Sequence, residues 1–309
     1  MKKTAFLFIT EAGTLEQQAV MLAESSALHC PWVDVFSFSP RKGYQPAQQT
    51  ISRLSELVTH CFFEDLNQKH ASFPLANTLY AAAFFEQNHP EYGDIFLIDT
   101  DTVFTKPPDP DSFDASGVYV RPVDNKGVGT EGPHDPNESF WQSVFAYFKL
   151  PLPDFFVTTS IRQQRIRPYF NSGFTAAIDV PGFYTRWLAD FDRLMDSHIR
   201  PAFIGRDGTN FGFFEQFSLS ITLAREPYLL KPLPDNINYP IPFHPFLKKH
   251  NRAISLEKQS HVHYHKWFQH PDFLDYVFDD DEKAQPAFSW LKARLPFSPV
   301  LDCPLRRFD

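Results

Sequence analysis

The stretch Asp94-Ile95-Phe96-Leu97-Ile98-Asp99-Thr100-Asp101-Thr102-Val103-Phe104 decides the fold predicted for this chain. Its apolar run at 95–98 indicates a strand buried on both faces, as in the middle of a parallel sheet. In open α/β sheets, ligands gather beyond the carboxyl ends of such strands. We therefore expect Asp99 and Asp101 to lie at a ligand-binding edge of the sheet.

Asp99 and Asp101 place two carboxylates two residues apart at this edge. Burying a charge without a partner is unfavourable, and a hard divalent cation, Mg²⁺ or Mn²⁺, prefers oxygen ligands. An Asp-x-Asp pair also occurs as a simple cap or turn. Its position directly after a buried strand favours a metal or phosphate site over that alternative.

The bulk composition excludes several classes of protein. The chain has 309 residues, enough for one large α/β domain or two small ones, and its net charge of −8 argues against nucleic acid as a partner. Its 3 cysteines form no Cys-x-x-Cys pair, which argues against a disulfide framework or a zinc site and fits a reducing compartment. From the cysteine pattern we predict a cytoplasmic protein. Because 34 residues are Phe, we also predict a core rich in aromatic side chains.

The amino terminus resembles the beginning of a signal peptide, but its apolar run stops at Glu11 and no cleavage site follows. We interpret it as a first strand. No apolar run approaches the roughly 18 residues that span a bilayer. The sequence thus predicts no transmembrane segment, and it leaves peripheral membrane association open.

Hydrophobic periodicity predicts strands and helices in a βαβ arrangement, with no internal repeat. Expected strands cover 3–9, 33–38, 95–98 and 117–123, and expected helices cover 14–28, 74–87, 138–148, 181–197 and a stretch from 214 onward. Long loops or extended segments are expected at 124–137 and 228–242, with a turn at 206–210.

The turn after the first strand should lie near the turn after the Asp-x-Asp strand, where backbone amides can hold a nucleotide. Thr10 and Glu11 are therefore candidate substrate-binding residues. The alternative is that the side chains of this turn only end a strand and start a helix.

Two clusters of basic residues stand out in this acidic chain. Arg162, Arg165 and Arg167 either contact a phosphate or acidic sugar or form a solvated face. Near the carboxyl end, the alternation of His261, His263 and His265 predicts that one strand face carries all three imidazoles. These histidines are either neighbours in one site or residues of the core and its rim.

Five features occur in a fixed order: the βαβ start, the Asp-x-Asp strand, Tyr-Phe-Asn-Ser-Gly at 169–173, Glu-Gln at 215–216 and His-Tyr-His-Lys-Trp at 263–267. Together they resemble the metal-dependent glycosyltransferases of the GT-A fold, and most closely the family-8-type retaining enzymes. The resemblance covers residues 1–270. It implies an α/β fold in which helices flank a central, mostly parallel mixed sheet.

The resemblance also implies a single catalytic domain over 1–270. Within it, 1–123 would form the nucleotide-binding half and 124–270 the acceptor and metal-completing half, while 271–309 would be an extension packed on the domain. The implied reaction moves a hexose from a nucleotide-diphosphate sugar, such as a UDP- or GDP-sugar, to a glycan or other acceptor.

Site residues follow from the same resemblance. Mn²⁺ or Mg²⁺ would be bound by Asp99, Asp101 and a late histidine, and His263 is chosen because His263-Tyr264 matches the family's His-(Tyr/Phe) step. The remaining predicted residues contact substrate or lie at the anomeric carbon: Asn171, Ser172 and Gly173 under the sugar, Lys266 beside the phosphates, and Glu215 and Gln216 at the reacting centre.

This chain departs from the family's pattern in three places. It has Glu215-Gln216 instead of the commoner Asp-Gln, no gap between His265 and Lys266-Trp267, and no basic residue at 77–78. These departures leave open the donor sugar and which histidine binds metal. Retention of configuration is implied, but an inverting reaction would make Glu215 the candidate base.

Two other interpretations remain at this stage. The stretch 99–103 also fits the start of haloacid-dehalogenase-like phosphatases, with Asp99 as nucleophile and Asp101 as acid/base, although that family places the motif on its first strand. A carbohydrate-binding relative that keeps the fold without turnover is the second.

Overall fold

The computed structural model describes residues 2–199, 212–301 and 305, and the turn expected at 206–210 lies outside these residues. The chain divides into two compact units, each built from several segments. The first unit comprises Met1–Lys2, Leu66–Phe96 and Ala115–Leu233, and the second comprises Lys3–Asp65, Leu97–Asp114 and Pro234–Asp309. These limits differ from the predicted halves, and the functional division of the domain stays a prediction.

The largest sheet of the described residues has the strand order β10-β6-β9-β4-β1-β2-β3. Its strands are β1 (Lys3–Ile9), β2 (Asp34–Phe38), β3 (His60–Phe62), β4 (Tyr92–Ile98), β6 (Gly117–Pro122), β9 (Phe170–Ile178) and β10 (Leu230–Pro232). Neighbours β1–β2, β2–β3 and β6–β10 are parallel, whereas β6 and β9 are antiparallel. The α/β class with a mixed, mostly parallel sheet is thereby confirmed.

The second unit begins with the predicted βαβ motif. Helix α1 (Thr14–His29) follows β1 and packs on it through a stripe that includes the fully buried Ala19 and Leu22. Helix α2 (Gln48–Ser55) packs beside α1. A smaller sheet in the same unit has the order β11-β12-β5, formed by β11 (Tyr239–Pro240), β12 (His261–His263) and β5 (Thr102–Phe104).

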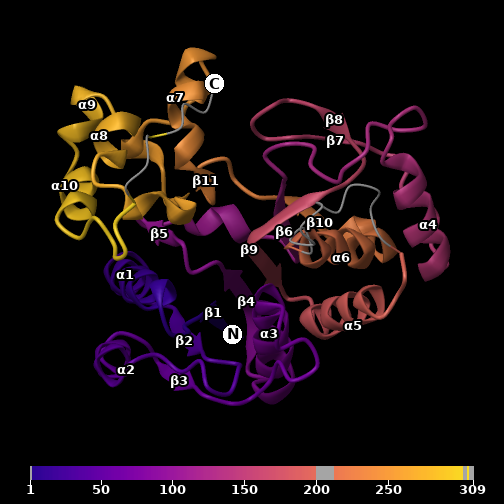
Figure 1. Cartoon of the computed structure of the whole chain (residues 1–309), viewed down its shortest axis with the longest axis horizontal. Coiled ribbons are helices and arrows are strands. Elements are labelled where there is room, and N and C mark those ends of the chain that lie inside the picture. Colours follow the sequence, from indigo (N-terminus) through magenta and orange to yellow (C-terminus); the bar gives the residue numbers. More distant parts are fainter. Residues whose placement is uncertain (1, 200–211, 302–304, 306–309) are drawn as a thin grey trace. The chain divides into compact units, whose positions relative to one another are not determined.

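Short helices of the carboxyl-terminal region complete the second unit, and the yellow end of the chain in Figure 1 shows α8, α9 and α10 together. They are α7 (His244–Lys249), α8 (Phe273–Val277), α9 (Asp280–Lys283) and α10 (Pro286–Lys292), with 3₁₀ turns η4 (Ile241–Phe243), η5 (Leu256–Lys258) and η6 (His265–Gln269). Arg294 pairs with Glu24 of α1 at 2.9 Å, which ties the end of this region to α1.

The first unit surrounds its strands with four helices, of which α5 and α6 lie side by side (Figure 1). The helices are α3 (Asn77–Asn88), α4 (Glu138–Phe148), α5 (Phe183–Met195) and α6 (Gly212–Arg225), and the 3₁₀ turns of this unit are η1 (Pro74–Ala76) and η3 (Pro227–Leu229). One further 3₁₀ turn, η2 (Pro110–Phe113), belongs to the second unit. Trp141, Tyr169 and Phe217 pack ring against ring in its core. This packing agrees with the aromatic-rich core expected from the composition.

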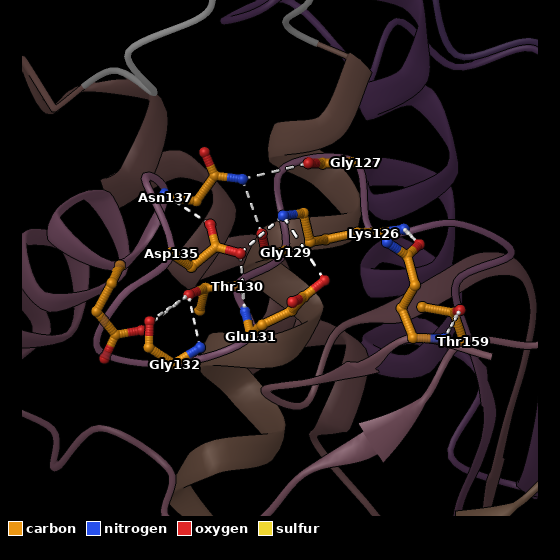
Figure 2. A network of polar contacts seen from close by, with 11 residues as sticks. Lys126, Gly127, Gly129, Thr130, Glu131, Gly132, Asp135, Asn137 and Thr159 are labelled. Carbon is orange, nitrogen blue, oxygen red and sulfur yellow. Dashed lines mark hydrogen bonds and ion pairs between the residues drawn. The ribbon is translucent and has the colours of Figure 1, made fainter. Parts of the chain in front are cut away.

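The loop predicted at 124–137 is present between β6 and α4, and it is held by a dense polar network (Figure 2). Lys126 pairs with Asp135 at 2.7 Å, and the Asn137 side-chain amide donates to the Gly129 carbonyl at 2.8 Å. Thr130 is fully buried. A two-stranded ribbon, β7 (Val157–Thr158) and β8 (Arg165–Ile166), follows α4.

No helix within the described residues is long and apolar enough to cross a membrane.

Candidate functional site

The turn that follows β4 is fixed by two threonine hydroxyls. Thr100 donates to the carbonyl of Ile9, the last residue of β1, at 2.6 Å, and Thr102 donates to the Asp99 carbonyl at 2.6 Å. Both threonines are buried, and a buried hydroxyl needs a hydrogen-bond partner because water cannot reach it. Here the backbone carbonyls are those partners. The sequence Asp-Thr-Asp-Thr thus builds a tight turn that presents the two aspartates at the carboxyl end of β4.

Strand pairing brings a histidine to Asp101. Strand β12 is antiparallel to β5, and His263 lies opposite Thr102 in this register. The amide of Tyr264 donates to the Asp101 carbonyl at 3.1 Å. As a result, the His263 Nε2 atom lies 3.1 Å from Asp101 Oδ1. The turn after β4 and the end of β12 thus contribute side chains to the same place.

The predicted strand with three alternating histidines is wrong in its last part. Strand β12 ends at His263, and His265 has φ +52° and begins the 3₁₀ turn η6. This left-handed residue turns the chain so that the His265 ring lies 4.0 Å from the His263 ring, between centroids. His265 Nδ1 is 3.7 Å from Asp101 Oδ2, so the expected proximity is retained by a different local geometry.

His261 has a different environment from the other two histidines. It is fully buried, its ring packs edge-on against Phe104, and its Nδ1 accepts a hydrogen bond from the Asn238 amide. Burial lowers the pKa of His261 well below its ordinary value, and the nearby His263 acts in the same direction. His261 therefore serves as a neutral core residue beneath the site.

The two aspartates have opposite electrostatic environments. Burial alone would raise the pKa of Asp101, but the charges and hydrogen bonds of His263 and His265 hold it well below its usual range. For Asp99, burial raises the pKa to about 6, and the Asp101 carboxylate adds to this shift while His263 opposes it. Asp101 is thus the carboxylate whose ionised form the two imidazoles favour, and Asp99 is the one that takes up a proton first as the pH falls.

The residues present fit a divalent cation. Asp101, His263 and His265 each offer one ligand atom, and these atoms all lie within 4.8 Å of one another. A carboxylate with imidazoles is a donor set that Mn²⁺ and related ions accept. Asp99, also predicted as a ligand, does not belong to this group, although it lies two residues away on the same turn.

The predicted nucleotide-binding pair at the end of β1 has other partners. Thr10 is fully buried, with its hydroxyl 2.7 Å from that of Ser37. The Glu11 carboxylate is 2% exposed and receives a forked contact from Arg41, with Nε at 3.0 Å from Oε1 and Nη2 at 2.5 Å from Oε2. These side chains connect the carboxyl ends of β1 and β2 to each other and to the loop that follows β2. A role in substrate binding stays a prediction for both Thr10 and Glu11.

In the first unit, the predicted sugar-facing turn lies at the start of β9. Ser172 donates to the Glu215 carboxylate on α6 at 2.7 Å, and the Asn171 carbonyl oxygen accepts from the Gly173 amide at 2.9 Å. Glu215 is 4% exposed, whereas Asn171 is half-buried. Two motifs 43 residues apart thereby meet through a side-chain hydrogen bond.

The remaining predicted residues are near these groups in sequence. Gln216 follows Glu215 on α6 and is half-buried. Lys266 is exposed in η6, directly after His265, and its Nζ lies 5.6 Å from the centroid of the Trp267 ring. Its ammonium group is therefore available to a charged ligand in the second unit.

Sequence reasoning missed one residue of this region. Arg41 neutralises Glu11 and lies 4.0 Å above the Tyr44 ring. Its signal in the sequence was the placement of a basic residue just after β2, at the same sheet edge as Glu11, but no spacing rule pairs side chains 30 residues apart.

The arrangement of strands resembles two solved glycosyltransferase structures, and both likenesses concern the fold. One is the galactosyltransferase LgtC in complex with donor and acceptor sugar analogues, at 12% identity and a TM-score of 0.53, covering 96% of this chain and 98% of that one. The other is the apo structure of the bifunctional glycosyltransferase WbbM, at 13% identity and a TM-score of 0.54, covering 95% of this chain and 52% of that one. The chain thus has the GT-A glycosyltransferase fold.

The family follows from the sequence match. Residues 6–225 match the model of the Rhodobacterales glycosyltransferase domain, and the chain belongs to this family. Comparison with curated protein sequences returned no match. The prediction of a GT-A-fold glycosyltransferase is confirmed, and the family assignment replaces the phosphatase alternative.

Proposed function

We propose that this glycosyltransferase moves a hexose from a nucleotide-diphosphate sugar, a UDP- or GDP-sugar, to a glycan or other acceptor, with a divalent cation and with retention of configuration. The observation that carries the proposal is the cluster of Asp101, His263 and His265 at the carboxyl end of β4. Ligands of open α/β sheets bind at this edge.

Asp101 and His263 would hold the cation, with His265 as a further ligand. A bound divalent cation supplies Lewis-acid neutralisation of the charge that develops on a leaving diphosphate. The threonine hydroxyls of the β4 turn keep Asp101 in place, and the exposed Lys266 adds a positive charge for the phosphates. Asp99 would support the same turn as a second carboxylate.

Asn171, Ser172 and Gly173 would position the hydroxyls of the transferred sugar, with Gln216 close to the anomeric carbon. Glu215 supports a retaining outcome because it is buried and already accepts the Ser172 hydroxyl at 2.7 Å. A general base needs to reach the acceptor proton, directly or through one water. In this proposal Glu215 holds Ser172 and stabilises positive charge at the anomeric carbon.

The test is to incubate the protein with individual UDP- and GDP-hexoses, with Mn²⁺ or with EDTA, and to measure release of the nucleoside diphosphate. We expect one donor to be consumed, and only with the metal present. Donor binding by calorimetry without release or transfer, over a broad panel of acceptors, would instead support the carbohydrate-binding relative that lacks turnover.

A further inference from the structure

The basic cluster singled out in the sequence contains one arginine with an unusual environment. The Arg165 guanidinium lies over the Phe156 ring, with Cζ 3.7 Å from the ring centroid, and the residue is exposed. Arg165 pairs with Thr158 across the β7–β8 ribbon, which fixes its backbone. Among the described residues, the arginines that form ion pairs are Arg41, Arg53, Arg167, Arg186, Arg225 and Arg294, and Arg165 is not one of them.

Arg193 lies over the Tyr147 and Phe148 rings and donates to the Tyr147 carbonyl. Four other arginines that lie over aromatic rings have an acidic partner. These pairs are Arg41 with Glu11, Arg167 with Glu138, Arg225 with Asp190 and Arg294 with Glu24. In each of them a carboxylate of the chain neutralises the guanidinium. Arg165 is stacked in the same way but keeps its charge directed to solvent, in a protein whose net charge is −8.

The ring beneath Arg165 lies against a hydrogen-bonded loop. The Phe156 ring packs against Gly132, where an added Cβ would lie 3.7 Å from the ring, and Gly132 has φ +118°. Gly132 belongs to the loop network of Figure 2, in which its amide donates to the Thr130 hydroxyl at 3.1 Å and its carbonyl accepts from the Asp135 amide at 2.8 Å. The network therefore fixes the platform on which Phe156 rests.

A second contact supports the same ring from the chain's interior. Arg167 lies 5.5 Å from the centroid of Phe156, and its Nη2 is 2.6 Å from Glu138 Oε1 in a buried ion pair. That pair is neutral overall, so the positive charge over the Phe156 ring is that of Arg165. A side chain that is already ordered loses less conformational entropy when it binds a ligand.

We infer that Arg165 on Phe156 is a binding subsite for an anionic group of the acceptor, a carboxylate or a phosphate carried by a glycan. The planar N–H fork of a guanidinium matches both oxyanions. The inference rests on the proposed glycosyl transfer and adds the acceptor class to it.

The position of Arg165 agrees with an acceptor role. It precedes Asn171 of the sugar-facing turn by six residues, so their Cα atoms are at most roughly 20 Å apart even if the chain were fully extended. An oligosaccharide spans such a distance. An acidic protein repels an acidic acceptor over much of its surface, so the Arg165 guanidinium would determine where along the surface the anionic group of the acceptor binds.

The experiment measures binding of three disaccharides to the full-length protein by calorimetry at low ionic strength. The probes are a glucuronate-terminated disaccharide, its methyl ester, and the matched disaccharide with a 6-phosphate. We expect wild type to bind an anionic probe about tenfold more tightly than the neutral ester, which equals about 1.4 kcal/mol. The preferred anionic probe identifies carboxylate or phosphate as the source.

Three variants make the measurement specific. Arg165→Ala should remove the preference for the anionic probe and leave the affinity for the ester unchanged. Arg165→Lys keeps the charge but loses the guanidinium fork, so it should retain part of the preference for the anionic probe. Arg294→Ala is the matched control, because Arg294 also stacks on a ring, 3.8 Å from the Trp290 centroid, but is paired with Glu24. It should behave as wild type.

Equal affinities of wild type for ester and anionic probes overturn the inference, and so does an unchanged preference in Arg165→Ala. Nucleotide release from the donor is assayed on the same samples. A wild type that prefers the anionic probe but releases no nucleotide would sink the proposed transfer while the anion site stands. Normal nucleotide release by a wild type that does not prefer the anionic probe would overturn the anion site while the proposed transfer stands.

Discussion

At the scale of single residues, Asp101 and Asp99 show how neighbours decide which carboxylate is charged. Asp101 faces the imidazoles of His263 and His265, and its pKa lies well below the usual range. Asp99, two residues earlier, has a pKa raised to about 6, chiefly by burial. The ionised form of Asp101 is therefore favoured by its neighbours, whereas that of Asp99 is disfavoured, and a bound cation would lower the pKa of both.

Asn171 is the residue for which a selective effect on transfer is expected. Its side-chain oxygen accepts from the Gly173 amide at 2.9 Å, so it shapes the turn that we assign to the sugar. Asn171→Ala should lower kcat/KM for transfer about 10- to 100-fold, the effect of losing one polar contact worth about 1–3 kcal/mol. Affinity for the free nucleoside diphosphate should stay within about twofold of wild type.

The control for this prediction is Asn171→Asp, which keeps an oxygen that can accept from the Gly173 amide. It should preserve the melting temperature and separate loss of turn shape from loss of the amide donors. If Asn171→Ala weakens nucleotide binding as much as transfer, the residue does not act on the sugar.

At the scale of elements, buried ion pairs connect segments that the sequence separates. Glu11 and Arg41 are 30 residues apart and join the end of β1 to the loop after β2. Their side chains are 2% and 10% exposed, respectively. Removing one partner of such a pair leaves the other charge buried and uncompensated, at a cost of about 3–5 kcal/mol.

Glu11→Gln should therefore lower the free energy of unfolding by about 3–5 kcal/mol in urea titrations. Asp275→Asn is the matched control, because the Lys292–Asp275 pair is exposed on both sides, and its loss should cost less than about 1 kcal/mol. The double variant Glu11→Gln/Arg41→Met should recover part of the lost stability. Similar losses in Glu11→Gln and Asp275→Asn would refute the structural role given to the Glu11–Arg41 pair.

A buried histidine makes the carboxyl-terminal helices sensitive to pH. His244 at the start of α7 is 1% exposed, with the Tyr239 hydroxyl at 2.8 Å from Nδ1 and Glu282 of α9 at 3.1 Å from Nε2. Burial lowers its pKa below 6.5, although Glu282 opposes the shift and Lys248 adds to it. The unfolded chain therefore takes up this proton at a higher pH than the folded chain does.

The free energy of unfolding should consequently fall as the pH is lowered below 6.5, the ordinary value for this group. His244→Gln removes the titrating group, so the variant should show a shallower loss of stability between pH 7.5 and 5.5 than wild type. The measurement is urea unfolding at each pH. Parallel pH profiles for the two proteins would show that His244 does not titrate differently on folding.

At the scale of the whole molecule, the sequence predicted the elements better than the contacts among them. The ranges 3–9 and 138–148 match β1 and α4, because continuous apolar runs and helical periodicity are local signals. The contact of Asp101 with His263 was anticipated only through the resemblance. It depends on the β5–β12 pairing, which joins segments about 160 residues apart in the chain.

His265 shows why the rest could not be predicted. Alternation favoured a continuous strand, yet the chain leaves the strand after His263 and adopts φ +52° at His265. A non-glycine residue in this region is uncommon and is sustained by tertiary contacts, which no local pattern reports. The hydrogen bond from Ser172 to Glu215 is likewise a product of packing between β9 and α6.

We propose that Asp101 binds a divalent cation on which nucleotide binding and transfer depend. The most direct measurement is the melting temperature of wild type and Asp101→Asn with a UDP- or GDP-sugar, first in EDTA and then with Mn²⁺ added back. Ligand at a hundredfold excess over its Kd stabilises the native state by about 2.7 kcal/mol. Asp235→Asn, an exposed substitution in the same unit, is the control.

We predict that Mn²⁺ raises the melting temperature of the nucleotide-bound wild type and of Asp235→Asn, but not of Asp101→Asn. Without ligand, Asp101→Asn should melt below wild type, because it loses the charge that His263 and His265 stabilise, and relief of the repulsion with Asp99 offsets only part of that loss. Its turnover should be at least about a hundredfold lower than that of wild type. Full nucleotide stabilisation in EDTA, or an Mn²⁺ response in Asp101→Asn equal to that of wild type, would contradict the account.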